Sequence, residues 1–225
     1  MIYPLRINKY LRDKGFASRH EADRLVDAGL VMVNGKRAKQ GMMINEKDVV
    51  SVKNNKQYQY FAYYKPRGLA TQDLEGAPSV IKDWKKKGIF PIGRLDKESE
   101  GLLILTNDGR LTAKVLGDKE QFEKEYMVKV REPLRSGIPA VFAKGMETEE
   151  LGKLLPAQAK IVNSHLLKVI LHEGKKHQIR IMLNELQTTI KELKRVRIGN
   201  IHLGTLRPGE IRPLTNKEIS GFFNA

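Results

Sequence analysis

The chain has 225 residues, enough for one medium-sized domain and a small one, and its 40% hydrophobic content can fill a core in each. Lysine and arginine outnumber aspartate and glutamate by 41 to 26, which gives a formal net charge of +15 and a sequence pI near 9.9. This excess favours a polyanionic partner. Nucleic acid is favoured over a membrane, because no apolar run approaches the roughly 20 residues of a membrane-spanning helix.

Several classes of chemistry lack their usual residues. The chain has no cysteine, which excludes disulfides, thiolate nucleophiles and cysteine-based zinc sites. Its five histidines form no His-x-x-x-His pair, and neither a GxGxxG nor a GxxxxGK[ST] phosphate loop is present. The N-terminus also lacks the apolar core of a signal peptide. We therefore expect a cytoplasmic protein that holds no metal and needs no cofactor.

Residues 1–52 are expected to form a compact N-terminal domain that opens with two helices. Apolar residues at helical spacing predict a first helix over residues 7–14, which ends at Gly15. Ser18 and Glu21 then form the pattern of a capping box, in which the serine hydroxyl accepts from the Glu21 amide and the glutamate reaches back to the Ser18 amide. A second helix should follow.

The same domain is expected to end in a small basic sheet. A strand over residues 31–33 leads into Asn34-Gly35, and both of these residues tolerate positive φ, which predicts a hairpin. A last strand lies around residues 49–52. Residues 1–60 carry a net charge of +6 and the rest of the chain +9, so both parts are suited to contact a polyanion.

After a polar linker over residues 53–60, strand-like and helix-like runs alternate irregularly to the end of the chain. A turn at Asn107-Asp108-Gly109 looks like a hairpin turn, so residues 61–225 are predicted to form an α+β domain with a mainly antiparallel mixed sheet. A second capping box, Thr215 with Glu218, opens the C-terminal helix. The predicted strands cover residues 58–64, 102–105, 126–130 and 166–171, and the predicted helices 179–186 and 215–223.

The stretch PIGRLDKESEGLLILTNDG, residues 91–109, is the most informative part of the chain. It places Arg94 and Asp96 in a tight loop after Gly93 and continues into the apolar run 102–105. Such a loop, anchored by a buried strand, can present a charged nucleophile rigidly at a groove. An arginine and an aspartate so close together can equally be a surface ion pair, so the loop alone does not establish catalysis.

Two resemblances give this loop a context. The N-terminal domain resembles the small RNA-binding domain named after ribosomal protein S-four, in Arg6-Ile7-Asn8-Lys9-Tyr10-Leu11, Ala17-Ser18-Arg19, Ala22 and Val33-Asn34-Gly35-Lys36. The whole chain resembles the RsuA-type pseudouridine synthases, which isomerise uridine within ribosomal RNA. The motifs that carry the second resemblance are residues 63–68, 91–109, 124–126, 171–180, 193–199 and 209–214.

The second resemblance implies a catalytic role for four residues. Asp96 would act either as the nucleophile toward the sugar or as the base that removes a sugar proton, and Arg180 would be its ion-pair partner. Arg94 would occupy the space that the flipped uridine leaves. Tyr126 would stack on the flipped base and could carry the proton that leaves carbon five.

The resemblance and the charge pattern also imply the partner. Ribosomal RNA, either free or in assembling ribosomal subunits, is the expected substrate of a protein that is expected to be a monomer. Two positions depart from the family pattern, Ile181 where a second arginine is common and Gln187 where a glycine is usual. The expected RNA-binding residues are Arg6, Lys9, Ser18, Arg19, Lys36, Arg37, Lys65, Arg67, Lys175 and Lys176.

Two other functions are compatible with a basic N-terminal domain of this kind. A non-catalytic factor that assists ribosome assembly predicts a damaged set of catalytic residues, whereas Asp96, Tyr126 and Arg180 are all present. A methyltransferase or an aminoacyl-tRNA synthetase predicts a nucleotide-binding glycine loop or a His-Ile-Gly-His motif, and the chain has neither. The sequence therefore favours the synthase.

Overall fold

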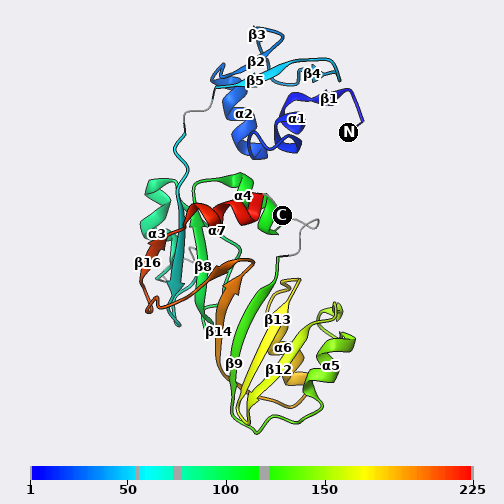
Figure 1. Cartoon of the computed structure of the whole chain (residues 1–225), viewed down its shortest axis with the longest axis vertical. Helices are drawn as coiled ribbons and strands as arrows, with labels where there is room; N and C mark the ends of the chain where they lie inside the picture. The colour runs from blue at the N-terminus through cyan, green and yellow to red at the C-terminus, as the bar shows by residue number, and fades with distance from the viewer. Residues whose placement is uncertain (1, 54–55, 73–77, 117–121, 224–225) are drawn as a thin grey trace.

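The computed structural model describes residues 2–53, 56–72, 78–116 and 122–223; five side chains in these ranges, at positions 19, 81, 83, 85 and 113, are left out of the description. Figure 1 shows a small N-terminal unit at one end of the molecule and a large twisted sheet with its helices at the other. No helix within the described ranges is both long and apolar enough to cross a bilayer.

The N-terminal unit packs two short helices against small antiparallel strand pairs, around its own core of residues such as Ile7, Leu11 and Val31. Asn34 has φ 50° and Gly35 φ 77°, so the hairpin predicted here is confirmed. The elements are β1 (Leu5–Arg6), α1 (Ile7–Asp13), α2 (Arg19–Asp27), β2 (Val31–Val33), β3 (Lys36–Arg37), β4 (Met43–Ile44) and β5 (Val50–Val52).

The capping box of α2 is only half formed. The Ser18 hydroxyl accepts from the Glu21 amide at 3.4 Å, as predicted. The Glu21 carboxylate is buried and turns away from Ser18, because it pairs with the Lys56 ammonium at 3.0 Å and accepts from the Tyr58 hydroxyl at 3.4 Å. Glu21, which the sequence predicted to complete a capping box, therefore connects α2 to the segment that follows the N-terminal unit.

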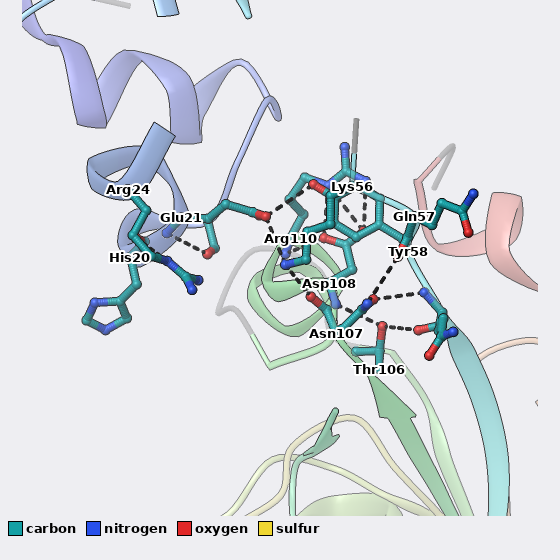
Figure 2. Close-up of polar contacts among 12 residues, drawn as sticks. His20, Glu21, Arg24, Lys56, Gln57, Tyr58, Thr106, Asn107, Asp108 and Arg110 are labelled. Atoms are coloured by element: carbon teal, nitrogen blue, oxygen red, sulfur yellow. Dashed lines mark hydrogen bonds and ion pairs between the residues drawn. The ribbon is translucent and has the colours of Figure 1, made fainter. Parts of the chain in front are cut away.

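This connection belongs to a larger polar contact between the two units (Figure 2). Lys56 also donates to the carbonyl of Asn107 at 3.0 Å, and the Arg110 guanidinium lies 4.2 Å from the centre of the Tyr58 ring. A Cβ on Gly109 would lie 2.7 Å from the Ser18 side chain, so the start of α4 (Gly109–Leu116) packs closely against the start of α2. The N-terminal unit thus contacts the unit that carries the large sheet. Ion pairs and hydrogen bonds fix the side chains at this contact.

The large sheet has the strand order β12-β13-β9-β14-β8-β6-β16, with β7 beside β8 and β15 beside β14. Its pairs are antiparallel except for β14 with β8, which are parallel, so the predicted mixed and mainly antiparallel sheet is confirmed. The strands are β6 (Tyr60–Lys65), β7 (Phe90–Ile92), β8 (Glu100–Thr106), β9 (Lys124–Val130), β12 (Gln158–Asn163), β13 (Leu166–Leu171), β14 (Ile190–Ile198), β15 (Ile201–His202) and β16 (Ile211–Pro213).

The parallel pair depends on a glycine. Gly101 has φ 106°, and a Cβ there would lie 2.3 Å from the carbonyl oxygen of Arg195 on β14. No other residue type allows β14 to approach β8 so closely at this point. This contact joins two strands that lie far apart in the sequence.

Two groups of helices cover the sheet, α5 (Ile138–Lys144) with α6 (Gln178–Glu185) and α4 with α7 (Asn216–Phe223), and each group has its own core, while Trp84 of α3 (Ile81–Trp84) packs against a further core. Phe142 of α5 and Met182 of α6 belong to a core that also includes residues of β9 and β13, whereas Leu111 of α4 and Phe222 of α7 pack with residues of β8 and β14. The Thr215–Glu218 capping box at the start of α7 is confirmed. The remaining elements are a 3-10 turn (Lys85–Lys87), β10 (Glu147–Thr148) and β11 (Gly152–Lys153).

The hairpin turn predicted at Asn107-Asp108-Gly109 is wrong. The chain leaves β8 at Thr106 and enters α4 at Gly109. Asp108 is fully buried, accepts from the Arg110 amide at 3.0 Å and pairs with the Arg110 guanidinium at 2.8 Å. Although burial acts to raise the pKa of Asp108, the bonds from Arg110 and Tyr60 outweigh it and lower that pKa. The Asn-Asp-Gly pattern thus serves as a strand-to-helix connection.

Candidate active site

A cavity of about 710 Å³ opens where the loop of residues 93–96 meets the sheet. Its walls include Arg94, Asp96 and Tyr126, three of the four residues expected to be catalytic. The loop contributes the first two, and β9 contributes the third. Residues 171–179, which run from the end of β13 into the start of α6, also line it.

Asp96 lies between two basic side chains. Its Oδ2 is 3.9 Å from Nε of Arg180, and its Oδ1 is 3.4 Å from Nε2 of His177. The Asp96 side chain is 32% exposed, so it remains open to the cavity. The sequence predicted the contact with Arg180 but not the one with His177.

The backbone explains how His177 reaches this position. It is the residue before α6 and has a left-handed conformation with φ 56°, which is uncommon for residues other than glycine, although asparagine, aspartate and histidine adopt it more often than the rest. Backbone in sparsely populated conformations of this kind often occurs at functional sites. The sequence signal available was the placement of His177 only three residues before Arg180, in one of the motifs.

Arg180 also fixes the segment that follows Asp96. Its Nη2 donates to the Glu98 carbonyl and to the Ser99 hydroxyl, each at 3.1 Å. The Ser99 amide in turn donates to the Asp96 carbonyl at 3.0 Å, which closes the turn. One arginine therefore supplies charge beside the carboxylate and holds its backbone.

The other end of the loop is held by Thr71, a residue that the sequence did not single out. Its hydroxyl donates to the Leu95 carbonyl at 2.7 Å and accepts from the Leu95 amide at 3.0 Å. The Leu95 side chain is buried in the core beneath the loop. Asp96 is thus carried by backbone that is fixed on both sides, as a reacting group requires.

Arg94 and Tyr126 occupy contrasting surroundings. Arg94 is exposed, with its Nη1 3.5 Å from the side-chain oxygen of Gln72. Tyr126 is buried in β9, directly opposite Val169 of β13 and Arg195 of β14. Arg94 is therefore accessible at the rim of the cavity, whereas Tyr126 belongs to its wall.

The prediction that Lys65 contacts RNA is wrong. The side chain has no exposed surface, and its ammonium donates to the carbonyls of Pro66 and Leu69 at 3.0 and 2.6 Å. Burial lowers the pKa of Lys65 to about 8, although the charges of Asp96 and Glu98 partly oppose the shift. Lys65 is therefore part of the interior beside the site.

The other residues predicted to contact RNA differ in how exposed their side chains are. Lys175 is half-buried, and its ammonium donates to the carbonyls of Leu151 and Lys153 at 2.8 and 2.9 Å. Ser18 caps α2 and lies against Gly109, a position that argues against its contact with RNA. The Arg19 side chain lies outside the described residues. Six are exposed, namely Arg6, Lys9, Lys36, Arg37, Lys176 and Arg67, and the last of these pairs with Glu98 at 3.1 Å.

The two departures from the family pattern lie on or just after α6. Gln187 has φ 53°, a left-handed conformation that glycine adopts without steric cost, so the backbone here is one that suits the glycine usual in the family. Ile181 and Arg180 line a second cavity of about 720 Å³, on another side of α6. Neither departure alters the contacts of Asp96 described above.

The fold and the site are those of an RNA-modifying isomerase. Comparison with known proteins identifies the family to which the chain belongs. Residues 59–185 match the family model described as RNA pseudouridylate synthase, and residues 5–50 match the S4 domain. The chain belongs to the RNA pseudouridylate synthase family. It therefore carries an N-terminal S4 domain and a pseudouridine synthase domain, as the sequence predicted.

Relatives align over nearly the whole chain. The dual-specificity RNA pseudouridine synthase RluF of Escherichia coli K12 is 36% identical over 97% of this chain and 78% of its own length. The ribosomal large subunit pseudouridine synthase B of Bacillus subtilis is 34% identical, with coverages of 95% and 93%. The ribosomal small subunit pseudouridine synthase A of Vibrio vulnificus is 33% identical, with coverages of 96% and 98%. A crystal structure of a pseudouridylate synthase superimposes with a TM-score of 0.73 at 27% identity, over 97% of this chain and 99% of the other.

Proposed function

We propose that the protein converts a specific uridine of ribosomal RNA to pseudouridine, with Asp96 as the reacting carboxylate. The observation that carries the proposal is the meeting of Asp96 and Tyr126 at one cavity, with Arg180 beside the Asp96 carboxylate, in a chain whose relatives include synthases of both ribosomal subunits. The reaction breaks the bond between N1 of uracil and C1′ of the sugar, turns the base and rejoins it through C5. It needs neither a redox step nor phosphate transfer.

The surroundings of Asp96 suit either of two roles. As a nucleophile it would attack the sugar, and as a base it would remove a sugar proton; both roles require an ionised and fixed carboxylate. Arg180 supplies the opposite charge and holds the turn, and Thr71 holds the residue before it. Tyr126 offers the flipped base an aromatic face from the wall of the cavity.

The uridine must leave its stack to reach this cavity, which costs a few kcal/mol. Arg94, exposed at the rim, is placed to fill the space that the base leaves in the RNA. The exposed Arg6, Lys9, Lys36 and Arg37 of the N-terminal unit would bind phosphates of the same RNA.

The remaining proposals concern organisation and setting. We place the S4-type RNA-binding domain at residues 1–52, the linker at 53–60 and the catalytic domain at 61–225. The protein would act as a monomer in the cytoplasm, on ribosomal RNA that is either free or part of an assembling subunit. This places it among the factors of ribosome biogenesis.

The test is a comparison of pseudouridine maps of ribosomal RNA from cells with and without the gene. We expect one or a few sites to vanish without the gene. They should return when wild-type protein is supplied and stay absent with Asp96→Asn. Maps that do not differ, together with purified protein that modifies no ribosomal RNA, would contradict the proposal.

A further inference from the structure

Arg195 of β14 is a buried cation with a free donor. The side chain is 4% exposed; its Nε donates to the Leu102 carbonyl at 2.8 Å and its Nη1 to the Arg94 carbonyl at 3.4 Å. Its Nη2 is shielded from water and finds no hydrogen-bond partner within the described part of the chain. A buried donor without a partner is destabilising, and more so when it is charged. Because Arg195 also lines the cavity that contains Asp96, a ligand in this cavity is the natural partner for Nη2.

The register of the sheet places this cation beside Tyr126. Arg195 lies directly opposite Tyr126 on one neighbouring strand and directly opposite Gly101 on the other. Residues opposite each other in paired strands project from the same face of the sheet, so the Arg195 and Tyr126 side chains leave the sheet on the same face. Gly101 has no side chain to compete for this space. A base that stacks on Tyr126 would therefore present an edge to Arg195.

A second cation adjoins the first. Lys124 lies two residues before Tyr126 on the same strand and lines the same cavity. Burial lowers the pKa of Lys124, and the charge of Arg195 lowers it further. Within the ranges that the structure describes, Lys124 forms no ion pair; its ammonium donates to the Phe122 carbonyl at 3.0 Å. Among the described residues neither Arg195 nor Lys124 pairs with a carboxylate, although Asp96 lines the same cavity, and two such neighbouring cations favour the binding of a negatively charged group.

Arg197, two residues further along β14, differs from Arg195 and Lys124 because carboxylates pair with it. Its guanidinium is also largely buried, but it pairs with Glu123 at 2.8 Å and with Glu125 at 3.1 Å. Arg197, which does not line the cavity, is thus neutralised by carboxylates, whereas Arg195 and Lys124, which do line it, form no ion pair among the described residues.

We propose that Arg195, assisted by Lys124, is a further catalytic residue that binds a carbonyl oxygen of the detached uracil. The inference rests on the proposed function. When the N1–C1′ bond breaks, both of its electrons stay on the base, and the negative charge spreads over N1, O2 and O4. Nη2 of Arg195 donates to one of these oxygens and holds the anion while C5 turns toward C1′.

The proposed step is balanced and independent of the role of Asp96. Once the C5–C1′ bond has formed, C5 loses its proton and N1 gains one, so neither an oxidant nor another co-reactant is needed. Nucleophilic attack and sugar-proton removal by Asp96 both release the same uracil anion. A preorganised donor to a developing oxyanion is worth about 100- to 1,000-fold in rate.

The experiment measures single-turnover pseudouridine formation on a ribosomal RNA transcript that carries uridine, 2-thiouridine or 4-thiouridine at the modified position. We expect Arg195→Gln to slow the uridine reaction about 100-fold, with RNA affinity changed by less than about threefold. Sulfur accepts hydrogen bonds weakly, so one of the two thio substitutions should slow the wild type about tenfold but Arg195→Gln by less than about twofold. Arg197→Gln, the matched control, should keep the wild-type pattern.

Two results would overturn the inference while leaving the proposed function intact. One is an Arg195→Gln rate equal to that of the wild type. The other is a thio substitution that slows wild type and variant by the same factor, since a merely structural arginine gives independent losses. If Arg195→Gln does not fold, Arg195→Lys is tested with the same three RNAs. The same fold-changes in rate then decide the outcome. A wild-type protein that makes no pseudouridine would instead remove the proposed function, and this inference with it.

Discussion

The two basic regions of this molecule hold their positive charge in opposite ways. In the N-terminal unit Arg6, Lys9 and Lys36 point into solvent. In the catalytic domain Lys65 and Arg195 lie in the interior, where each donates two hydrogen bonds to backbone carbonyl oxygens. Net charge alone, +6 against +9, does not distinguish the two regions.

The difference separates two uses of a cation. An exposed lysine or arginine attracts phosphate over a distance and releases counterions when RNA binds, so its effect falls with added salt. A buried one is costly to desolvate and is retained where it fixes backbone or meets charge that develops during a reaction. We therefore expect substitutions in the first region to change RNA affinity, and substitutions in the second to change rate or stability.

The largest effect within this comparison should come from Arg180. Arg180→Met removes the charge near Asp96 and two hydrogen bonds to its turn, so single-turnover pseudouridine formation should slow about 100-fold or more. RNA affinity, measured by filter binding, should change by less than about threefold. Lys129→Gln, which breaks an exposed ion pair with Glu192, is the control and should leave both quantities unchanged. A loss of affinity equal to the loss of rate would show that Arg180 binds RNA and does not serve the chemistry.

Lys65 should make stability depend on pH. Because its pKa is about 8 in the folded chain and near 10.5 when unfolded, only the unfolded state keeps the proton between these values. The free energy of unfolding should therefore rise between pH 8 and 10.5, by about 3 kcal/mol at most.

Urea unfolding at several pH values checks this, with Lys65→Met as the comparison. The rise attributed to Lys65 is the difference between wild type and variant, since other groups titrate in the same window. If the free energy of unfolding depends on pH equally in the two proteins, the buried ammonium has an ordinary affinity for its proton.

The smallest effect should come from the N-terminal surface. Replacing Arg6, Lys9 and Lys36 together by glutamine should weaken RNA binding about tenfold at low salt and reduce the salt slope by about 2, with the single-turnover rate at saturation unchanged. The matched control replaces Lys144, Lys160 and Lys217, which are exposed in the catalytic domain, and so removes the same charge elsewhere. Equal losses in the two triple variants would show that net charge matters and its position does not.

Local patterns predicted the parts of the fold that depend on local chemistry. Asn34-Gly35 specifies its hairpin through positive φ, and the apolar run from Leu166 to Leu171 forms the strand that was predicted. The motif resemblance indicated that Asp96 and Tyr126 belong to one site, and both line the same cavity.

What escaped prediction depends on contacts between distant segments. Nothing near Lys65 in the sequence indicates that its ammonium lies in the interior beside the site. The approach of Arg195 to Gly101 follows from a parallel pairing of β14 with β8, two strands that lie far apart in the chain. The Asn107-Asp108-Gly109 segment has the composition of a turn, but the buried Asp108 makes it the entry to a helix. In each case the tertiary surroundings override what the local residues favour.

The central claim, that Asp96 performs the chemistry in this cavity, is tested most directly with ribosomal RNA carrying tritium at C5 of uridine, because forming the carbon–carbon bond releases that tritium. Wild-type protein should release it in step with pseudouridine formation. Asp96→Asn should bind the same RNA with unchanged affinity and release none. Tritium release by Asp96→Asn at the wild-type rate would contradict the account.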